Sequence, residues 1–373
     1  MDDVEVVVVG AGQAGLSSAY HLRRTGWEPG RDFVVLDRSP HPGGAWQFRW
    51  PTLTYGRVHG MHSLPGMELT GADPARPSAE VIGEYFDAYE RAFGLRVLRP
   101  VHVRAVREAG DGRLRVESDA GVWTTRALIN ATGTWDRPFV PRVPGQETFA
   151  GRQVHTARYP GPDAFADERV VVVGGGTSAV QHLLEISRTA AATAWVTRRE
   201  PLFTEAPFDE DRGRAAVALV EERVRDGLPP RSVVSVTGLP MTEEVRAARE
   251  SGVLRRLPMF DRIVPAGVEW DDGRAVAADS IVWATGFRPV VGHLAPLRLR
   301  EAGGGIRMAG TRVARDPRIH LVGYGPSAST VGANRAGRAA VRQVRALLGR
   351  DRAGGPGSGP LLGGATAREP AAR

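Results

Sequence analysis

The chain of 373 residues contains no cysteine. This absence excludes disulfide frameworks, thiolate zinc sites and dithiol redox relays, so any redox chemistry must be carried by a bound cofactor. The sequence also lacks an apolar run of the roughly 20 residues that a membrane-spanning helix needs. Its first ten residues, MDDVEVVVVG, are acidic and enter a strand pattern directly, unlike a secretory signal. We therefore expect a cytoplasmic protein that has no membrane partner, and we expect no metal site.

Lysine is absent as well, so the 49 basic residues are all arginine, against 42 acidic residues. A basic protein can bind nucleic acid, but these arginines are spread along the whole chain and no recognition motif accompanies them. We therefore expect no nucleic-acid partner. The length allows two domains. The oligomeric state stays open, with a homodimer as one option.

A glycine-rich turn follows the first strand pattern. The β-branched run VEVVVVG leads into Gly10, Gly12 and Gly15, a helix pattern follows, and a second strand ends at Asp37. In a dinucleotide-binding βαβ unit, such glycines permit the tight turn, the close approach of a pyrophosphate and the packing of helix on strand. The helix N-terminus then faces the phosphates, and Asp37 can accept hydrogen bonds from a ribose. The alternative is a glycine turn in an α/β domain that binds no nucleotide.

Residues 38–169 interrupt this doubly wound pattern. An amphipathic helix is predicted over 78–94, where apolar residues recur near helical spacing. Three strands with turn residues between them are predicted over 95–109, 113–119 and 121–133. This pattern indicates an antiparallel β excursion from the first sheet.

Residues 170–288 repeat the pattern of strand, glycine turn and helix seen at the start of the chain. A valine-rich strand is followed by a second glycine turn and a helix, with Gly174, Gly176, Thr177 and Ser178 at the junction. The next strand ends at Arg198 and Arg199 instead of an acidic residue. Guanidinium groups suit a 2′-phosphate through charge-assisted bidentate hydrogen bonds. The alternative is a solvated strand end in an arginine-rich chain.

Two further features connect these repeats. An Ala-Thr-Gly segment that ends in Thr132 and Gly133 recurs later in the chain with Thr285 and Gly286. A third strand–glycine–helix junction at Gly323 suits closure of the first nucleotide domain over its cofactor.

The predicted fold class is α/β, with two Rossmann-like dinucleotide-binding domains, the second inserted into the first, and an antiparallel β excursion. The expected segments are a first domain over 1–148, a second domain over 149–283 with a helical insertion at about 200–262, a return to the first domain over 284–351, and a disordered tail over 352–373.

The segment FAGRQVHTARYP, residues 149–160, precedes the second glycine turn. Together with the two fingerprints, the paired Ala-Thr-Gly segments and the GGAW sequence, it resembles the class B flavin-dependent monooxygenases. Their identifying motif is F-x-G-x-x-x-H-x-x-x-[Y/F/W], and Phe149, Gly151, His155 and Tyr159 fill its positions. The resemblance covers nearly the whole chain to about residue 350.

This resemblance implies that the first fingerprint holds FAD and the second holds NADPH. Gly44 and Trp46 of the GGAW sequence would lie near the flavin. In the family, NADPH reduces the flavin, which captures dioxygen as a C4a-hydroperoxide and transfers one oxygen atom to a small-molecule substrate. The protein must orient the cofactor and exclude water.

Two motif residues carry specific expectations. By the resemblance, His155 helps retain NADP⁺ over the flavin; the alternative is a linker histidine bonded to the backbone. Tyr159 stands where Baeyer–Villiger members usually have Trp, which favours oxygenation at N or S.

One departure from the family leaves alternatives open. Family members often carry an Asn after GGxW that contacts the flavin, whereas the only asparagines here are Asn130 and Asn334. Polar residues between Trp46 and Leu64 that could substitute for it are Thr54, Tyr55, Arg57, His59 and His62. If none does, the protein would be an NADPH oxidase or a reductase passing electrons to oxygen, a quinone or a partner protein. A non-catalytic FAD-binding redox sensor is a further alternative.

The substrate is not predicted by the sequence. Four apolar residues of the 200–262 segment could roof the active site or simply pack in the core, namely Phe203, Phe208, Met259 and Phe260.

Overall fold

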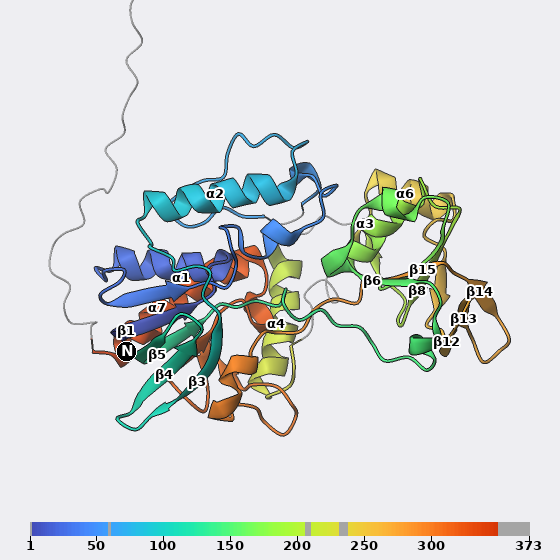
Figure 1. Cartoon of the computed structure of the whole chain (residues 1–373). Coiled ribbons are helices and arrows are strands. Elements are labelled where there is room, and N and C mark those ends of the chain that lie inside the picture. The colour runs from blue at the N-terminus through green and yellow to red at the C-terminus, as the bar shows by residue number, and fades with distance from the viewer. Residues whose placement is uncertain (1, 59–60, 206–209, 231–237, 350–373) are drawn as a thin grey trace, which may run out of the picture.

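The computed structural model describes residues 2–58, 61–205, 210–230 and 238–349. His59, Phe208 and the predicted tail over 352–373 lie outside the described residues. The chain forms two lobes, one around β1 with α1, α2 and α7, the other around β8 with α3 and α6 (Figure 1). The predicted fold class is confirmed by these two sheets and their βαβ units.

The first lobe is built on an eight-stranded sheet. β1 (Asp2–Val9) lies parallel to β2 (Phe33–Leu36) on one side and to β5 (Val122–Asn130) on the other, and β18 (Ile319–Leu321) continues the parallel ladder beyond β5. Val6, Val7 and Val8 are completely buried because helices and loops cover both faces of this sheet. The uninterrupted valine run is explained by that burial.

Helices α1 (Gln13–Arg24) and α7 (Thr330–Leu347) pack against each other on one face of the sheet. Their contact is close at Gly337, where a Cβ atom would lie 3.0 Å from Cβ of Ser17. Helix α2 (Ser78–Ala92) contributes Phe86 and Tyr89 to the same core. The amphipathic helix predicted over 78–94 is thereby confirmed.

The antiparallel excursion consists of β3 (Val103–Ala109) and β4 (Arg113–Ser118), which pair with each other and then with β5. The first of these strands begins at Val103, later than the predicted 95, because Leu98 bonds instead to Val35 of β2 and Pro100 has no amide hydrogen for a ladder. At the far edge the sheet ends in β16 (Met308–Ala309) and β17 (Arg312–Val313).

The second lobe has a parallel five-stranded sheet in the order β11, β8, β7, β15, β6. These strands are β6 (Arg152–His155), β7 (Arg169–Val173), β8 (Ala192–Thr197), β11 (Arg256–Pro258) and β15 (Ser280–Trp283). Helices α3 (Thr177–Ile186) and α6 (Glu243–Glu250) pack together, and a small antiparallel sheet is formed by β12 (Arg262–Val264), β13 (Gly267–Glu269) and β14 (Ala275–Ala277).

The 200–262 segment belongs to both lobes. It contains β9 (Phe203–Thr204), α4 (Glu210–Arg225) and β10 (Leu239–Pro240) before α6 and β11. Val224 of α4 is buried in the core of the first lobe, near Gly325. Phe203 contacts Trp195, and Met259 and Phe260 pack in a core that includes Trp283. These three residues therefore serve packing.

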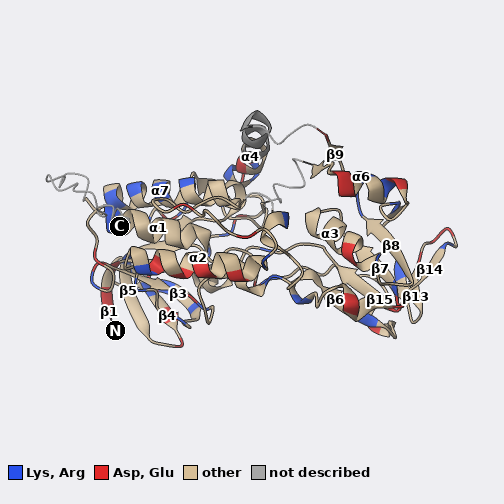
Figure 2. Ribbon diagram, turned by 90° about the horizontal axis from the view of Figure 1, so that it is seen from above, with Lys and Arg blue, Asp and Glu red and all other residues tan. Residues whose placement is uncertain are grey.

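Two chain segments cross between the lobes and are hydrogen-bonded to each other. These crossing segments include residues 133–139 and 286–290. The backbone N–H of Phe139 donates to the carbonyl of Gly286 at 2.9 Å, and that of Val290 donates to the carbonyl of Gly133 at 2.9 Å. Seen from above, the lobes lie at the two ends of an elongated molecule (Figure 2). The paired segments therefore connect the two nucleotide units through one shared ladder.

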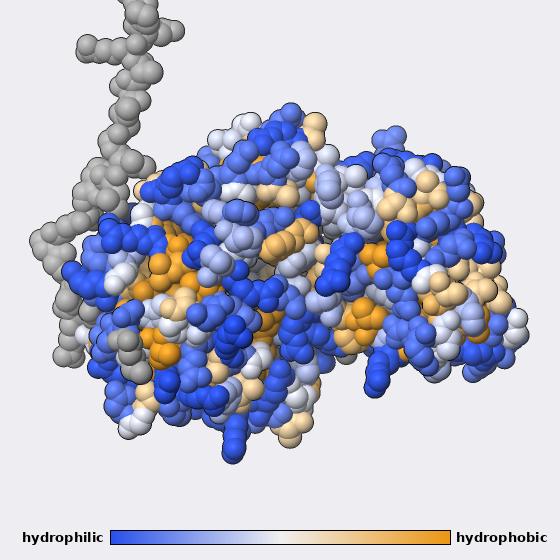
Figure 3. Space-filling model, viewed as in Figure 1, coloured by the Kyte–Doolittle hydropathy of each residue, from blue (hydrophilic) through white to orange (hydrophobic). Residues whose placement is uncertain are grey.

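Short 3-10 helices occupy several connections: η1 (Gly44–Phe48), η2 (Tyr55–Arg57), η3 (Gln146–Thr148), η4 (Thr156–Arg158), η5 (Pro162–Phe165), η6 (Gly292–Leu297) and η7 (Gly325–Ser327). The face in Figure 3 is mostly hydrophilic, with hydrophobic residues in separate patches. Among the described residues, no helix combines the length and the apolar character that crossing a membrane requires.

Candidate functional site

The first glycine turn joins β1 to α1. Gly10 has a φ of +99°, and a Cβ atom on it would lie 2.6 Å from the carbonyl oxygen of Ala131. A Cβ on Gly15 would lie 1.8 Å from the carbonyl oxygen of Gly10, so no side chain fits at either position. Gly12 directly precedes α1, and no side chain of the described residues caps the first N–H groups of that helix. Those donors can therefore bind an anionic ligand.

A second backbone segment approaches this turn. Gly44 has a φ of +52°, and a Cβ atom on it would lie 2.8 Å from Cα of Gly12. Gly43 also has a positive φ, of +122°. Two backbone segments without side chains, at Gly12 and Gly44, therefore meet beside the N-terminus of α1. A ligand can approach their peptide groups directly.

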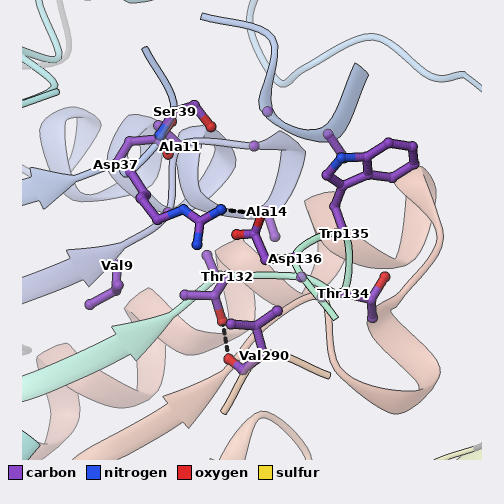
Figure 4. A pocket seen from close by; sticks show the side chains of 18 of the residues that line it. Val9, Ala11, Ala14, Asp37, Ser39, Thr132, Thr134, Trp135, Asp136 and Val290 are labelled. Carbon is purple, nitrogen blue, oxygen red and sulfur yellow. Dashed lines mark hydrogen bonds and ion pairs between the residues drawn. The ribbon is translucent and has the colours of Figure 1, made fainter. Parts of the chain in front are cut away.

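A pocket of about 1000 Å³ opens at this place, between the ends of β1 and β2, the residues 44–49 and 131–137, and the start of α7 (Figure 4). Ligand pockets span about 300–1,000 Å³, so this one suits a large ligand. The glycine cradle and this volume fit FAD. The predicted residues that line it are Gly10, Gly12, Asp37, Gly44, Trp46, Thr132, Gly133 and Gly323.

Asp37 is buried at the end of β2 and faces the pocket. Its Oδ1 accepts a hydrogen bond from the backbone N–H of Ser39 at 3.1 Å, and its Oδ2 lies 3.5 Å from Nη2 of Arg99. Arg99 is in turn held by Glu90 at 2.6 Å. The Asp37 carboxylate is thus held in place, and Arg99 balances its charge. Its hydrogen bond to a ribose remains a prediction.

Several pocket residues were not predicted from the sequence. Arg38 forms an ion pair of 2.7 Å with Asp136, drawn as a dashed line in Figure 4. Nε2 of His293 lies 2.7 Å from Oδ1 of Asn130, and Nδ2 of Asn130 donates to the hydroxyl of Thr132. Burial lowers the pKa of His293 to about 4, so the ring is neutral at pH 7 and donates to Asn130. The signal available in sequence was only that Asn130 ends a strand beside the Ala-Thr-Gly segment.

The second glycine turn repeats this geometry between β7 and α3. A Cβ atom on Gly174 would lie 2.2 Å from the carbonyl oxygen of Ala284, whereas Gly176 has open space around its Cβ position. No side chain within the described part of the chain caps α3 at Gly176, so the N–H groups of Thr177 and Ser178 start the helix free of a capping bond. This turn fits the phosphates of a second dinucleotide.

Arg198 and Arg199 directly follow β8, at the same sheet edge as the second glycine turn. Both side chains are exposed, and within the described residues neither guanidinium has a hydrogen bond or ion pair. They are free to bind a phosphate, and that role stays a prediction.

His155 ends β6, and both of its ring nitrogens are bonded to the backbone. Its Nδ1 accepts from the N–H of Ala157 at 3.0 Å, so Nε2 carries the hydrogen and donates to the carbonyl of Gly286 at 3.1 Å. Burial lowers its pKa, opposed by the bond to Gly286. The ring also packs edge-on against Phe287. These contacts attach His155 to the crossing segment; its proposed contact with the nucleotide is untested.

Tyr159 is buried in the second lobe and is not among the residues that line the pocket. Its hydroxyl donates to Oε2 of Glu185 at 3.3 Å, and its ring lies 3.9 Å from that of His182 between centroids. Burial, and then Glu185, raise its pKa. Thr52 donates to the same Glu185 oxygen at 2.9 Å, which links the loop after η1 to α3.

The other catalytic candidates lie apart from the pocket lining. Thr54 forms a backbone bridge with Pro77, and the side chain of His62 is exposed. His59 lies outside the described residues. Of the later pair, Thr285 donates to the carbonyl of Phe139, and Gly286 belongs to the crossing segment.

Two amides from helices of the first lobe reach the segment where an Asn was expected. Nδ2 of Asn334 donates to the carbonyl of Ser63 at 2.8 Å, and Nε2 of Gln13 donates to the carbonyl of His62 at 3.0 Å. Gln13 and Asn334 also bond to each other at 3.0 Å. Gln13 and Asn334 are 321 residues apart in the sequence, and a contact between such distant residues leaves no local signal. For this reason the sequence did not predict the pair.

Comparisons with known proteins show the family of this chain. Residues 7–226 match the family described as pyridine nucleotide-disulphide oxidoreductase. The flavin-containing monooxygenase of Stenotrophomonas maltophilia is 38% identical, with a TM-score of 0.79 over 93% of this chain and 100% of that chain. The probable indole-3-pyruvate monooxygenase YUCCA4 of Arabidopsis thaliana is 32% identical over 322 residues, 76% of this chain and 75% of its own. A cyclohexanone monooxygenase at 17% identity and a TM-score of 0.66, over 94% of this chain and 89% of that chain, shares the fold.

The disulfide chemistry in the name of the matched family has no counterpart here, because the chain contains no cysteine. The matched residues 7–226 include both glycine turns. With its FAD-sized pocket and its 38% identity to a flavin-containing monooxygenase over nearly the whole chain, the protein belongs to the class B flavin monooxygenases, oxidoreductases that use FAD and NADPH.

Proposed function

We propose that this monooxygenase transfers one oxygen atom from dioxygen to a nitrogen or sulfur atom of a small-molecule substrate. FAD supplies the chemistry when bound, since it accepts a hydride from NADPH and reacts with dioxygen. The chain's own residues bind the two nucleotides, orient them and exclude water.

The observation that carries the proposal is the ladder between the two crossing segments. One wall of the FAD pocket, residues 131–137, is bonded through Gly133 and Arg137 to Val290 and Arg288 of the return segment. The second glycine turn touches the same return segment at Ala284. This arrangement supports a reaction in which the two nucleotides act on each other across the ladder.

The preference for N or S rests on Tyr159. By the resemblance, Trp is usual at this motif position in Baeyer–Villiger members. The tyrosine hydroxyl bonds to Glu185, and the ring packs between Trp50, Phe165 and His182. We propose that Tyr159 acts on the packing between the lobes, because it does not line the pocket.

The test is a panel of thioethers, tertiary amines and ketones incubated with the FAD-loaded protein, NADPH and ¹⁸O₂. We expect labelled sulfoxides or N-oxides, with NADPH consumption that rises when the substrate is added. Labelled esters as the main product would contradict the preference for N and S.

A second candidate is the NADPH oxidase, favoured by the lack of an Asn between Trp46 and Leu64. The amides of Gln13 and Asn334 donate to backbone carbonyls of that segment. Hydrogen peroxide equal to the NADPH consumed, with every substrate of the panel, would establish the oxidase instead.

A further inference from the structure

Arg49 follows η1 and lines the FAD pocket. Its guanidinium carbon lies 5.1 Å from the ring centroid of Trp46 and 4.6 Å from that of Trp135. Trp135 in turn stacks on Phe48 and on Phe287 of the return segment. The cation is therefore held between aromatic rings, where the ladder meets the pocket wall.

Within the described part of the chain, no carboxylate forms an ion pair with this cation. Among the described residues, the guanidinium of Arg49 has no hydrogen bond or ion pair, and its Nε is buried without a partner. Arg99 shows the usual arrangement in the same lobe, since two carboxylates surround its buried guanidinium. Burial of Arg49 lowers its pKa to about 10, which still leaves it charged at pH 7. Arg49 as a whole is half-buried, but its Nε is enclosed without a partner. An unpaired, partly desolvated charge is costly, so its presence in a binding pocket indicates an anionic ligand group.

The part of the ligand that faces Arg49 follows from the pocket. The glycine turn and the free N–H groups of α1 already provide for the pyrophosphate, and Asp37 marks the ribose side. Figure 4 shows Asp37 and Trp135 on opposite sides of the pocket. Arg49, packed on Trp135, is therefore on the side away from the ribose, where the isoalloxazine ring of FAD remains to be accommodated.

That ring acquires its charge during the reaction. Hydride transfer breaks a C–H bond of the dihydronicotinamide and delivers two electrons and one proton, so NADPH becomes NADP⁺ and neutral oxidised flavin becomes the anion FADH⁻. We infer that Arg49 is a positioned cation that stabilises the reduced, anionic flavin over the oxidised form. This inference rests on FAD binding and does not depend on which atom of the substrate is oxygenated.

The predicted effect is on the midpoint potential of the bound flavin. Replacing Arg49 by Met keeps an unbranched side chain against the two tryptophans and removes the charge. We expect reduced FAD to lose about tenfold to a hundredfold in affinity relative to oxidised FAD. For a two-electron couple this equals a fall of about 30 to 60 mV, since tenfold corresponds to about 30 mV.

The experiment measures the potential of purified holoprotein by equilibration with reference dyes, for wild type, Arg49→Met, Arg49→Gln and Arg49→Lys. The Lys variant keeps the charge and should remain near wild type, while both neutral variants should fall together. Arg288→Met is the matched control, because Arg288 also stacks on an aromatic ring, at 4.1 Å from the centroid of Phe139, but is exposed and does not line the pocket.

Three results would overturn the inference. An unchanged potential in both neutral variants, with FAD bound as in wild type, would show that the cation does not sense the flavin charge. A higher KM for a carboxylate substrate with an unchanged potential would assign Arg49 to the substrate instead. If the Met and Gln variants lost affinity equally for oxidised and reduced FAD, Arg49 would contribute to binding the cofactor and not to its potential. Because no substrate is needed for the potentials, failure of the N- or S-oxygenation proposal leaves this test intact.

Discussion

Nε2 of His155 donates a hydrogen bond to the carbonyl oxygen of Gly286 at 3.1 Å, and this bond joins the end of β6 to the return segment between the lobes. The bond from Ala157 to Nδ1 selects the tautomer that can donate it. Since the same Gly286 carbonyl also accepts from the N–H of Phe139, His155 reinforces the ladder where the two nucleotide units meet.

We predict that His155→Ala still reduces flavin with NADPH but releases more hydrogen peroxide. Loss of the bond to Gly286 loosens the segment that keeps the nucleotides together, and a looser site admits water. The measurement is the ratio of hydrogen peroxide released to NADPH consumed, with a turned-over substrate present.

Tyr159→Phe is the control for that ratio, because it keeps the ring against Trp50 and His182 and removes only the bond to Glu185. Its effect should be smaller than that of His155→Ala. A ratio in His155→Ala equal to that of wild type would leave the histidine a purely structural linker.

We predict that Gly44→Ala weakens FAD binding severely. A Cβ atom there would lie 2.8 Å from Cα of Gly12, at a φ of +52°, so the two backbones must separate where the cofactor is to lie. Gly110→Ala is the control, since its Cβ would meet nothing within 4 Å. FAD titration followed by fluorescence measures both. Wild-type affinity in Gly44→Ala would contradict the cradle.

The sequence predicted the parts of this molecule that depend on local pattern. Each strand–glycine–helix junction was found because its strand, glycine turn and helix are adjacent in the sequence. The groups that Gly10 and Gly174 approach, at Ala131 and Ala284, come from distant segments and were not predicted. The role of Arg49 was not predicted because it depends on contact with Trp135, which only the fold brings beside it. Tyr159 was recognised by its motif, but its burial against Glu185 could not be read from spacing. Contacts across many residues leave no periodic signal.

We predict that the double variant Arg198→Ala with Arg199→Ala raises KM for NADPH by about tenfold to a hundredfold, while KM for NADH changes little. The estimate follows from the loss of a charge-assisted phosphate contact, typically about 1.5–3 kcal/mol. Initial rates of flavin reduction with each nucleotide provide the measurement. A wild-type protein that prefers NADH would show that these arginines do not read a 2′-phosphate.

Acid should destabilise the folded protein through its buried histidines. Burial lowers the pKa values of four histidines below the ordinary 6.5, to about 4 for His21, His293 and His320 and about 3 for His182. Below pH 6.5 these histidines become protonated in the unfolded chain, whereas in the folded chain they stay neutral down to about pH 4. The free energy of unfolding should therefore fall as the pH falls through this window, and this part of the stability is fully present above it.

His320 offers the sharpest test of this sign. It is completely buried, its Nδ1 lies 3.1 Å from the hydroxyl of Thr311, and its Nε2 has no partner among the described residues. His320→Gln cannot titrate, so its unfolding free energy should fall less steeply, by about 1 kcal/mol per pH unit between pH 6 and 5. Urea unfolding at pH 7.5, 6 and 5 measures the slope, with exposed His41→Gln as control. Equal slopes in His320→Gln and wild type would mean that this ring takes up its proton without unfolding.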